Sequence, residues 1–145
     1  MKFYAILSSA AVASAAVMYN RDVEFSVSNF TAGCLGHSTQ CMVAFNVFQP
    51  GETIGVHCDT FVSAIPGAGG PNVIPNFEGA KCTNSSRTFD FARNEEGAII
   101  TVSQQVSQLS YITGTHQLNG SDFKITYAPN AWVENYTGPT SFNLE

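Results

Sequence analysis

The chain has 145 residues, of which 44% are hydrophobic and only 12% are charged. This length fits one domain, and high hydrophobicity with low charge is the opposite of what a disordered chain shows. Six Lys and Arg against eleven Asp and Glu give a formal net charge of −5, which excludes a nucleic-acid-binding surface built on clustered basic residues.

The first residues have the pattern of a secretory signal peptide. After Lys2, the run Phe3–Val17 is apolar or small throughout, and Ala13-Ser14-Ala15 forms an A-x-A cleavage site. A transmembrane anchor is the alternative, but the run is short and rich in Ala and Ser, whereas a span needs about 20 strongly apolar residues. We therefore expect residues 1–15 to be cleaved and residues 16–145 to form a single domain that is secreted from the cell.

The rest of the chain shows the residue types and the two-residue period of β-strands. Val, Ile, Thr and Phe are frequent, whereas Leu, Lys and Glu are few, which favours a pleated sheet over a helix. Apolar residues alternate with polar or small ones in several short runs, each typical of a half-buried strand. In chain order, these runs are Val23–Ser28, Val43–Val47, Ile54–Asp59, Phe89–Phe91, Ala98–Ser103 and Phe123–Tyr127.

Turn residues separate these runs and indicate the fold class. Gln49–Glu52, Asn94–Gly97 and Asn119–Asp122 each combine Gly with Pro, Asn or Asp, and Gly97 suits a position with positive φ. The pattern predicts an all-β fold, an antiparallel β-barrel or sandwich of about seven to nine short strands. Helix is expected to be scarce, at most a single turn near Pro129–Val133.

Four cysteines, Cys34, Cys41, Cys58 and Cys82, fit an exported protein with two disulfides. Of the three pairings, Cys34–Cys41 with Cys58–Cys82 is favoured. The segment between the first two reads as a loop between strands, and the second pair would tie the base of the Pro- and Gly-rich segment 62–81. A zinc site is disfavoured, since structural zinc sites use tightly spaced pairs such as C-x2-C. No metal ion or cofactor is expected.

Four Asn-x-Ser/Thr sequons are candidate N-glycosylation sites in a secreted protein. They start at Asn29, Asn84, Asn119 and Asn135. A glycan needs a solvent-facing asparagine, so the fold decides which of the four are used.

Two pairs of side chains are candidates for interaction with a partner. His57 and Asp59 lie two residues apart on one face of a predicted strand, where they could share a metal or act as an acid/base pair. A surface pair beside a disulfide is the interpretation that we favour. Trp132 and Tyr136 belong to an aromatic C-terminal segment together with Tyr127. Exposed rings would suit stacking on sugars or on a protein, whereas buried rings would fill the core.

Four longer segments carry a resemblance to a known family: FSVSNFTAGCLGHSTQCMVAFNVF, SSRTFDFARNEEGAIITVSQQV, TGTHQL and YTGPTSFNLE. They resemble the small secreted hypersensitive-response-inducing proteins of plant-associated filamentous fungi and, more distantly, the Alternaria major-allergen family. The resemblance implies a compact β-barrel, secretion during contact with a plant, and the induction of defence or cell death. In this family pattern, Cys58 and Cys82 match a disulfide between the third strand and the segment before the fourth. The cysteine that the allergen family uses for dimerisation has no counterpart, so a monomer is expected.

We therefore expect a secreted effector or elicitor that contributes to virulence. It would be no enzyme, and it would bind a plant protein at the cell surface or inside the plant cell, without nucleic acid and without inserting into a membrane. An extracellular carbohydrate- or cell-wall-binding module is the alternative, and it requires Trp132 or Tyr136 to be exposed in a row of rings. A small secreted hydrolase is a further alternative, and it requires a cleft that gathers His57 and Asp59 with another acid.

Overall fold

The computed structural model of the protein describes residues 22–66 and 70–145, and most of the described chain forms β-strands in two sheets. The predicted signal peptide, residues 1–15, lies outside the described residues. The larger sheet contains β1 (Phe25–Cys34), β2 (Gln40–Phe48), β3 (Val56–Ser63), β4 (Ile65–Pro66), β5 (Asn72–Val73), β10 (Phe123–Ala128), β11 (Ala131–Tyr136) and β12 (Phe142–Leu144). The smaller sheet contains β6 (Phe77–Lys81), β7 (Arg87–Asn94), β8 (Gly97–Ser107) and β9 (Ser110–Asn119).

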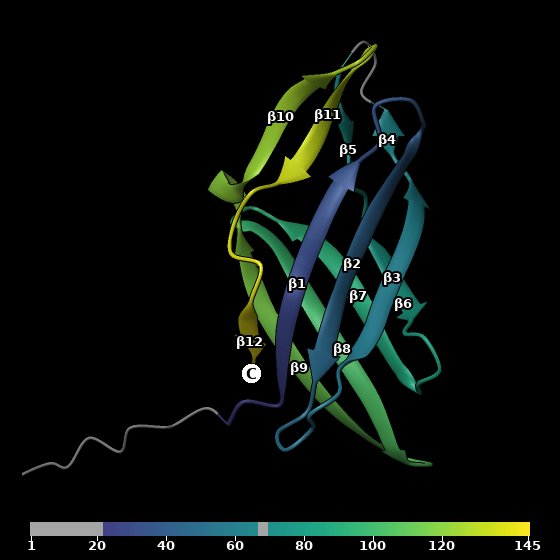
Figure 1. Ribbon diagram of the computed structural model, residues 1–145, viewed down its shortest axis with the longest axis vertical. Helices are drawn as coiled ribbons and strands as arrows, with labels where there is room; N and C mark the ends of the chain where they lie inside the picture. The colour runs from purple at the N-terminus through teal and green to yellow at the C-terminus, as the bar shows by residue number, and fades with distance from the viewer. Residues whose placement is uncertain (1–21, 67–69) are drawn as a thin grey trace, which may run out of the picture.

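The two sheets pack face to face as a β-sandwich (Figure 1). The larger sheet has the order β3-β2-β1-β11-β5-β4, with β10 beside β11 and β12 beside β1. The smaller sheet is a meander of β6, β7, β8 and β9. Among the described strands, only β5 and β11 pair in parallel. The predicted all-β, largely antiparallel fold with little helix is therefore confirmed.

The described chain has more strands than the predicted seven to nine. The additional strands are short, because β4 and β5 have two residues each and β12 has three. Pieces of this length are too short to show an alternating pattern, so sequence periodicity could not find them. A second difference concerns the predicted run Ile54–Asp59, since β3 begins only at Val56 and the side chain of Ile54 is exposed.

The helical turn predicted near Pro129–Val133 is wrong, because this segment is the turn and the start of the second strand of a hairpin. Ala128 pairs with Ala131, and the two residues between them form the turn. Asn130 has a φ of 74°. A proline followed by a residue with positive φ is the signature of a type II β-turn, which reverses the chain and does not continue into a helix. Within the described residues, no helix has the length and apolar character needed to cross a membrane.

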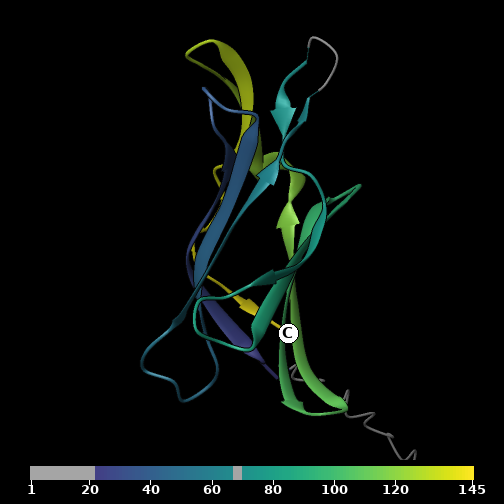
Figure 2. The ribbon, with the colours of Figure 1, turned by 90° about the vertical axis from the view of Figure 1, so that its right-hand side faces the viewer.

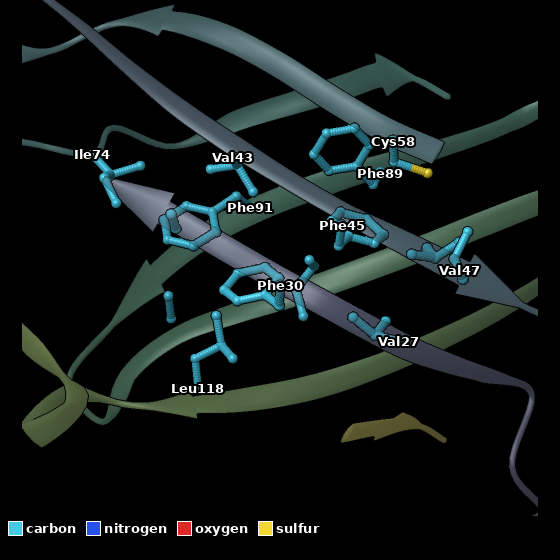
Figure 3. Packing of buried hydrophobic residues seen from close by; sticks show 14 of the residues in the cluster. Val27, Phe30, Val43, Phe45, Val47, Cys58, Ile74, Phe89, Phe91 and Leu118 are labelled. Atoms are coloured by element: carbon cyan, nitrogen blue, oxygen red, sulfur yellow. The ribbon is translucent and has the colours of Figure 1, made fainter. Parts of the chain in front are cut away.

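Phenylalanines from both sheets form the centre of the core (Figure 3). Phe45 of β2 and Phe89 of β7 lie edge to face, with ring centroids 5.0 Å apart. Each is fully buried or nearly so, and so is Phe30 of β1. Such edge-to-face contacts between inward-pointing side chains are the packing expected between sandwiched sheets. Replacing one of these rings by alanine would cost about 3–5 kcal/mol of stability.

Two links join the edges of the sheets, which Figure 2 shows as separate layers. On one side, the disulfide Cys58–Cys82 and a backbone bridge between the same residues connect β3 to the end of β6. On the other side, Thr115 of β9 and Glu145 exchange backbone hydrogen bonds of 2.9 and 3.0 Å. Both links reduce the length of unpaired strand edge, and unpaired edges are the places where sheets aggregate.

Both predicted disulfides are present. Cys34 and Cys41 are direct cross-strand partners of β1 and β2, so their bond closes the loop at the end of this hairpin. Cys58 and Cys82 close the longer loop that contains β4, β5 and β6. All four cysteines are therefore oxidised, and three of them are at most 4% exposed.

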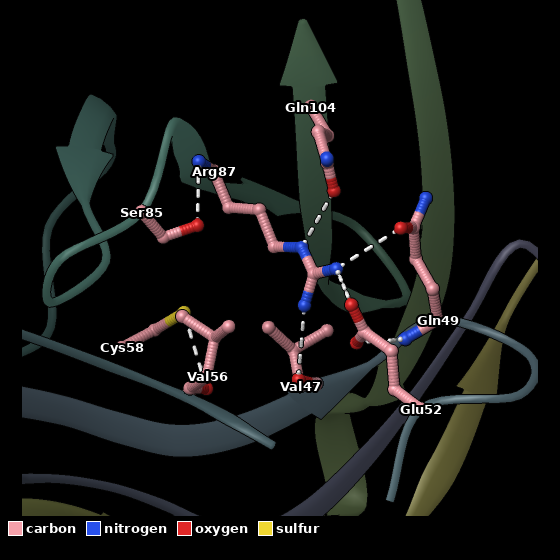
Figure 4. A network of polar contacts seen from close by, with 8 residues as sticks. All are labelled: Val47, Gln49, Glu52, Val56, Cys58, Ser85, Arg87 and Gln104. Carbon is pink, nitrogen blue, oxygen red and sulfur yellow. Dashed lines mark hydrogen bonds and ion pairs between the residues drawn. The ribbon is translucent and has the colours of Figure 1, made fainter. Parts of the chain in front are cut away.

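A buried cation ties the smaller sheet to the loop after β2 (Figure 4). The Arg87 side chain, only 2% exposed, donates to the Gln104 side chain at 2.7 Å and to the Val47 carbonyl at 3.2 Å. It also donates to Gln49 at 3.1 Å and to the Glu52 carboxylate at 2.6 Å. A buried guanidinium is tolerated only where its donors are satisfied, so this network positions the 49–52 turn.

Candidate functional site

His57 and Asp59 lie together on the outer face of β3, as their spacing predicts. The distance from His57 Nε2 to Asp59 Oδ1 is 3.8 Å, and their side chains are 53% and 43% exposed. The other ring nitrogen, Nδ1, lies 3.0 Å from Asn46 Oδ1 on the neighbouring strand β2. The pair is thus an open surface pair, next in sequence to the disulfide-bonded Cys58.

No further acid joins this pair within the described chain. Across residues 22–66 and 70–145, no three His, Cys, Asp or Glu side chains gather closely enough to hold a metal ion. The other two histidines lie elsewhere: His37 is exposed in the small disulfide loop, and His116 stacks on Phe142 at a centroid distance of 4.2 Å.

Tyr136 belongs to the edge of the core. Its ring meets Phe30 edge to face at 5.1 Å and lies 5.3 Å from Phe123. Its hydroxyl donates to the Pro139 carbonyl at 3.2 Å. Burial raises the pKa of this hydroxyl above its usual value of 10.0, and the nearby Asp122 carboxylate adds to the rise. Tyr136 therefore contributes to packing and does not form part of an exposed row of rings.

Trp132 is exposed, and its neighbouring ring is Tyr127. The two residues face each other directly across the β10–β11 hairpin, with ring centroids 5.2 Å apart and planes inclined by 62°. Their exposed fractions are 55% for Trp132 and 65% for Tyr127. Figure 1 shows this hairpin at one end of the molecule, beyond the ends of β7, β8 and β9. We call the exposed side chains Ile125, Tyr127 and Trp132 the aromatic tip.

The aromatic tip is the outer part of one continuous hairpin face. Residues two apart on a strand, and direct partners across an antiparallel pair, share a face. Ile125 pairs with Glu134, one step further in from the Tyr127–Trp132 pair. The innermost pair, Phe123 with Tyr136, packs on the core. The face that fills the core at its inner end is thus exposed at its outer end.

Glu134 and Arg93 anchor the base of this face. The Glu134 side chain is buried, and its carboxylate accepts hydrogen bonds from Arg93 Nη2 and, at 3.1 Å, from the backbone N–H of Ile74. The Arg93 Nε donates to the Ile74 carbonyl at 3.2 Å, and its guanidinium lies 4.6 Å above the ring of Phe123. These contacts hold the hairpin to both β7 and the residue that follows β5.

Sequence reasoning missed this anchor and the partner of Trp132. Alternation placed Ile125 and Tyr127 in a half-buried strand, but both side chains are exposed. The dipeptide Pro129-Asn130 could have indicated a two-residue hairpin turn, and such a turn would have placed Tyr127 opposite Trp132. The ion pair of Arg93 with Glu134 joins residues 41 positions apart, and no local pattern signals it.

The four sequons differ in their surroundings. Asn29, Asn84 and Asn119 are all exposed. Asn29 has a φ of 53° within a bulge of β1, and Asn84 has a φ of 50° in the turn before β7. Asn29 therefore lies where the register of β1 against β2 shifts, and Asn84 lies outside the strands.

Asn135 is half-buried inside β11. It pairs with Gly33 of β1, and its Nδ2 donates to the Thr126 hydroxyl at 3.4 Å. A Cβ atom at Gly33 would collide with the Asn135 side chain, so this side chain occupies the space that the missing Cβ leaves. Asn135 is thus the sequon whose amide is engaged in the fold.

Comparisons of the chain with models of known protein families, with curated proteins and with solved structures give no match.

Proposed function

We propose that this chain is a secreted fungal effector or elicitor that induces plant defence responses or hypersensitive cell death and contributes to virulence. It acts by binding and not by catalysis. Three features support the proposal. They are the signal-peptide pattern of residues 1–15, the resemblance carried by the strand and cysteine pattern, and an exposed aromatic tip on a disulfide-bonded sandwich.

The aromatic tip is the observation that carries the binding part of the proposal. Tyr and Trp are the residue types most enriched among the side chains that dominate binding energies, since each buries a large area at a small cost in rotamer entropy. Rings needed only for packing would be covered by the core, as the half-buried Tyr136 is by Phe30 and Phe123. The ion pair of Glu134 with Arg93 fixes the hairpin in place, so little ordering entropy is lost when a partner binds.

The direct test is infiltration of the purified, oxidised protein into leaves. We expect local cell death or a defence marker such as an oxidative burst, and a weaker infection when the gene is deleted from the producing organism. A Tyr127→Ala/Trp132→Ala variant tests the role of the tip. Tyr111→Ala is its matched control, because Tyr111 is an aromatic residue that is 63% exposed on β9, in the smaller sheet and outside the β10–β11 hairpin.

Two results would contradict the proposal. The first is a protein that is folded, with both disulfides formed, and that causes no response in any plant tested while gene deletion leaves infection unchanged. The second is an unaltered response after both rings of the tip are removed, which would place recognition on another surface. Thermal unfolding of each variant establishes that the tested protein is folded.

A further inference from the structure

We propose that the aromatic tip binds a neutral glucan chain of the plant cell wall, by stacking of a sugar ring on Trp132 beside Tyr127. The inference rests on the proposed function, which places the protein next to that wall. It names the chemical class of the ligand that the protein binds at the wall.

The ring geometry fits one sugar unit at a time. The planes of Tyr127 and Trp132 are inclined by 62°, so the two rings form a corner and not a flat platform. A glucose ring with equatorial hydroxyls has a flat C–H face that can lie on one aromatic ring while its hydroxyls reach sideways. The Tyr127 hydroxyl and the Trp132 N–H are the polar groups of this corner, and neither has a hydrogen-bond partner within the described residues.

The size of the aromatic tip also favours a sugar chain. With exposed fractions of 65%, 55% and 43%, Tyr127, Trp132 and Ile125 together expose roughly 300–400 Å² of side chain, given that one aromatic side chain buries about 150–250 Å². A stable protein interface buries about 800 Å² on each partner. The tip is therefore too small for a stable protein partner by itself, and it is large enough for one sugar ring.

The charge of the tip selects a neutral chain. Glu134, the charged residue on the same hairpin face, is buried and paired with Arg93. Lys124 lies between Phe123 and Ile125 on β10, so the pleat directs it to the opposite face. An acidic wall polymer such as pectin would need unpaired cations at the site, and this face offers none among its described residues. A neutral β-linked glucan needs only the rings and hydrogen-bonding groups.

The hairpin is held rigid enough to present the rings. Its turn contains Pro129, whose φ is fixed by its ring, and Asn130 in the left-handed region with a φ of 74°. At its base, Val133 pairs with Asn72 of β5, and Glu134 is fixed by Arg93. Rings that are already in place lose little freedom when a sugar stacks on them.

The experiment measures retention of the full secreted chain on insoluble cellulose, with chitin and de-esterified pectin as comparison polymers. We expect retention on cellulose for the wild type and for Tyr111→Ala, and an affinity at least tenfold lower for Trp132→Ala and Tyr127→Ala. Trp132→Phe keeps a ring for stacking and should retain part of the affinity. Trp132 is the only tryptophan of the chain, so its fluorescence reports the same contact when soluble cello-oligosaccharides are titrated in.

Each outcome decides the inference. No retention of the wild type on cellulose, equal retention of all variants, or retention on chitin or pectin alone would overturn it. If the alanine variants lose retention and also unfold, Trp132→Phe separates the two causes. This variant must fold and bind cellulose for the inference to hold. If cellulose binding is absent but leaf responses still depend on the tip, this inference fails while the proposed function stands. If the protein binds cellulose but leaves do not respond to it, this inference stands while the proposed function fails.

Discussion

The Glu52 carboxylate accepts a 2.6 Å hydrogen bond from Arg87, the most deeply buried cation among the described residues. A second oxygen of the same carboxylate accepts the backbone N–H of Gln49 at 2.8 Å. The hydrogen bond from Arg87 holds the pKa of Glu52 below its usual value of 4.5, and the Gln49 N–H acts in the same direction. The loop between β2 and β3 is thus fixed to the smaller sheet by one ionised carboxylate.

Glu52→Gln should lower the free energy of unfolding at pH 7 by about 1 kcal/mol or less, because the carboxylate is about one-third exposed and solvent screens the pair. The folded-state pKa is depressed, so this contribution is fully present above pH 4.5 and is lost as the pH falls through the folded-state pKa. Urea unfolding at pH 7 and at pH 3 measures the difference. The difference between wild type and variant should be smaller at pH 3 than at pH 7, since protonation of Glu52 removes the charge that Gln lacks.

Glu78→Gln is the control for this prediction, because Glu78 is exposed on β6 and makes no ion pair among the described residues. Its stability should match that of the wild type at pH 7. A Glu52→Gln variant that is as stable as Glu78→Gln at pH 7 would show that the Arg87 network does not depend on the carboxylate charge.

The two disulfides should contribute unequally to stability. Cys58 and Cys82 are 24 positions apart, against 7 for Cys34 and Cys41. Chain-entropy arguments give about 3.5 kcal/mol for closing the longer loop and about 2.5 kcal/mol for the shorter one. The double variant Cys58→Ala/Cys82→Ala should therefore unfold at a lower urea concentration than Cys34→Ala/Cys41→Ala. The reverse order would show that the hairpin closed by Cys34–Cys41 matters more than the link between the sheets.

Gly97 and Gly51 should respond differently to alanine, although both have positive φ. At Gly97, with a φ of 139°, a Cβ atom would collide with the backbone of Leu118 and Gly120, whereas nothing lies within 4 Å of a Cβ atom at Gly51. Gly51→Ala should cost about 1 kcal/mol from backbone strain alone. Gly97→Ala should cost about 3 kcal/mol or more, because backbone atoms cannot rotate away. Equal midpoints in urea unfolding would contradict the collision.

Local patterns were sufficient for the fold where each strand carries its own signal. The alternation of Ala98, Ile100 and Val102 appears in the structure as three fully buried side chains. The positive φ of Gly97 also follows from its place after Glu96 in a tight turn. Such features depend only on residues that are neighbours in the chain, so a single sequence is enough to predict them.

The candidate site was less predictable, because it depends on register and on contacts between distant residues. The sequence shows that this segment is rich in aromatic residues, but it does not show which of the rings the core covers. Tyr136 is covered because it meets Phe30, a residue more than a hundred positions away, whereas Trp132 extends beyond the smaller sheet. Likewise, no sequence pattern near Glu134 predicts that Arg93 pairs with its carboxylate. Apolar and polar residues alternate in the same way at the exposed end and at the buried end of a strand. Which end is covered depends only on how far the opposing sheet extends.

Glycan occupancy should follow the exposure of the sequons in protein secreted from a eukaryotic host. We expect glycans on Asn29, Asn84 and Asn119, and none on Asn135, which is half-buried and whose amide donates to Thr126 of the neighbouring strand. Peptide mass spectrometry after enzymatic deglycosylation in water labelled with heavy oxygen gives the occupancy of each site, because hydrolysis converts a glycosylated Asn to a labelled Asp. A fully occupied Asn135 would show that its Nδ2 leaves the Thr126 hydroxyl, and would contradict the use of this amide in the fold.

His116 should titrate at an unusually low pH. Its ring stacks on Phe142 at 4.2 Å with an interplanar angle of 15°. Burial lowers the pKa of His116 below its usual value of 6.5, against smaller opposing effects of a hydrogen bond with the Asn143 backbone and of the Glu145 charge. The unfolded chain therefore binds a proton at a higher pH than the folded chain does. The contribution to stability is complete above pH 6.5 and is lost as the pH falls below it.

Phe142→Ala tests this cause, because removing the ring exposes the imidazole and should raise the pKa of His116 towards 6.5. NMR titration of the imidazole resonances measures the pKa of His116 in wild type and variant. The contrary result is a His116 resonance that titrates at or above pH 6.5 in the wild type, which would show that the imidazole stays hydrated beside Phe142. In that case β12 would pack less closely on β9 than the hydrogen bonds between Thr115 and Glu145 indicate.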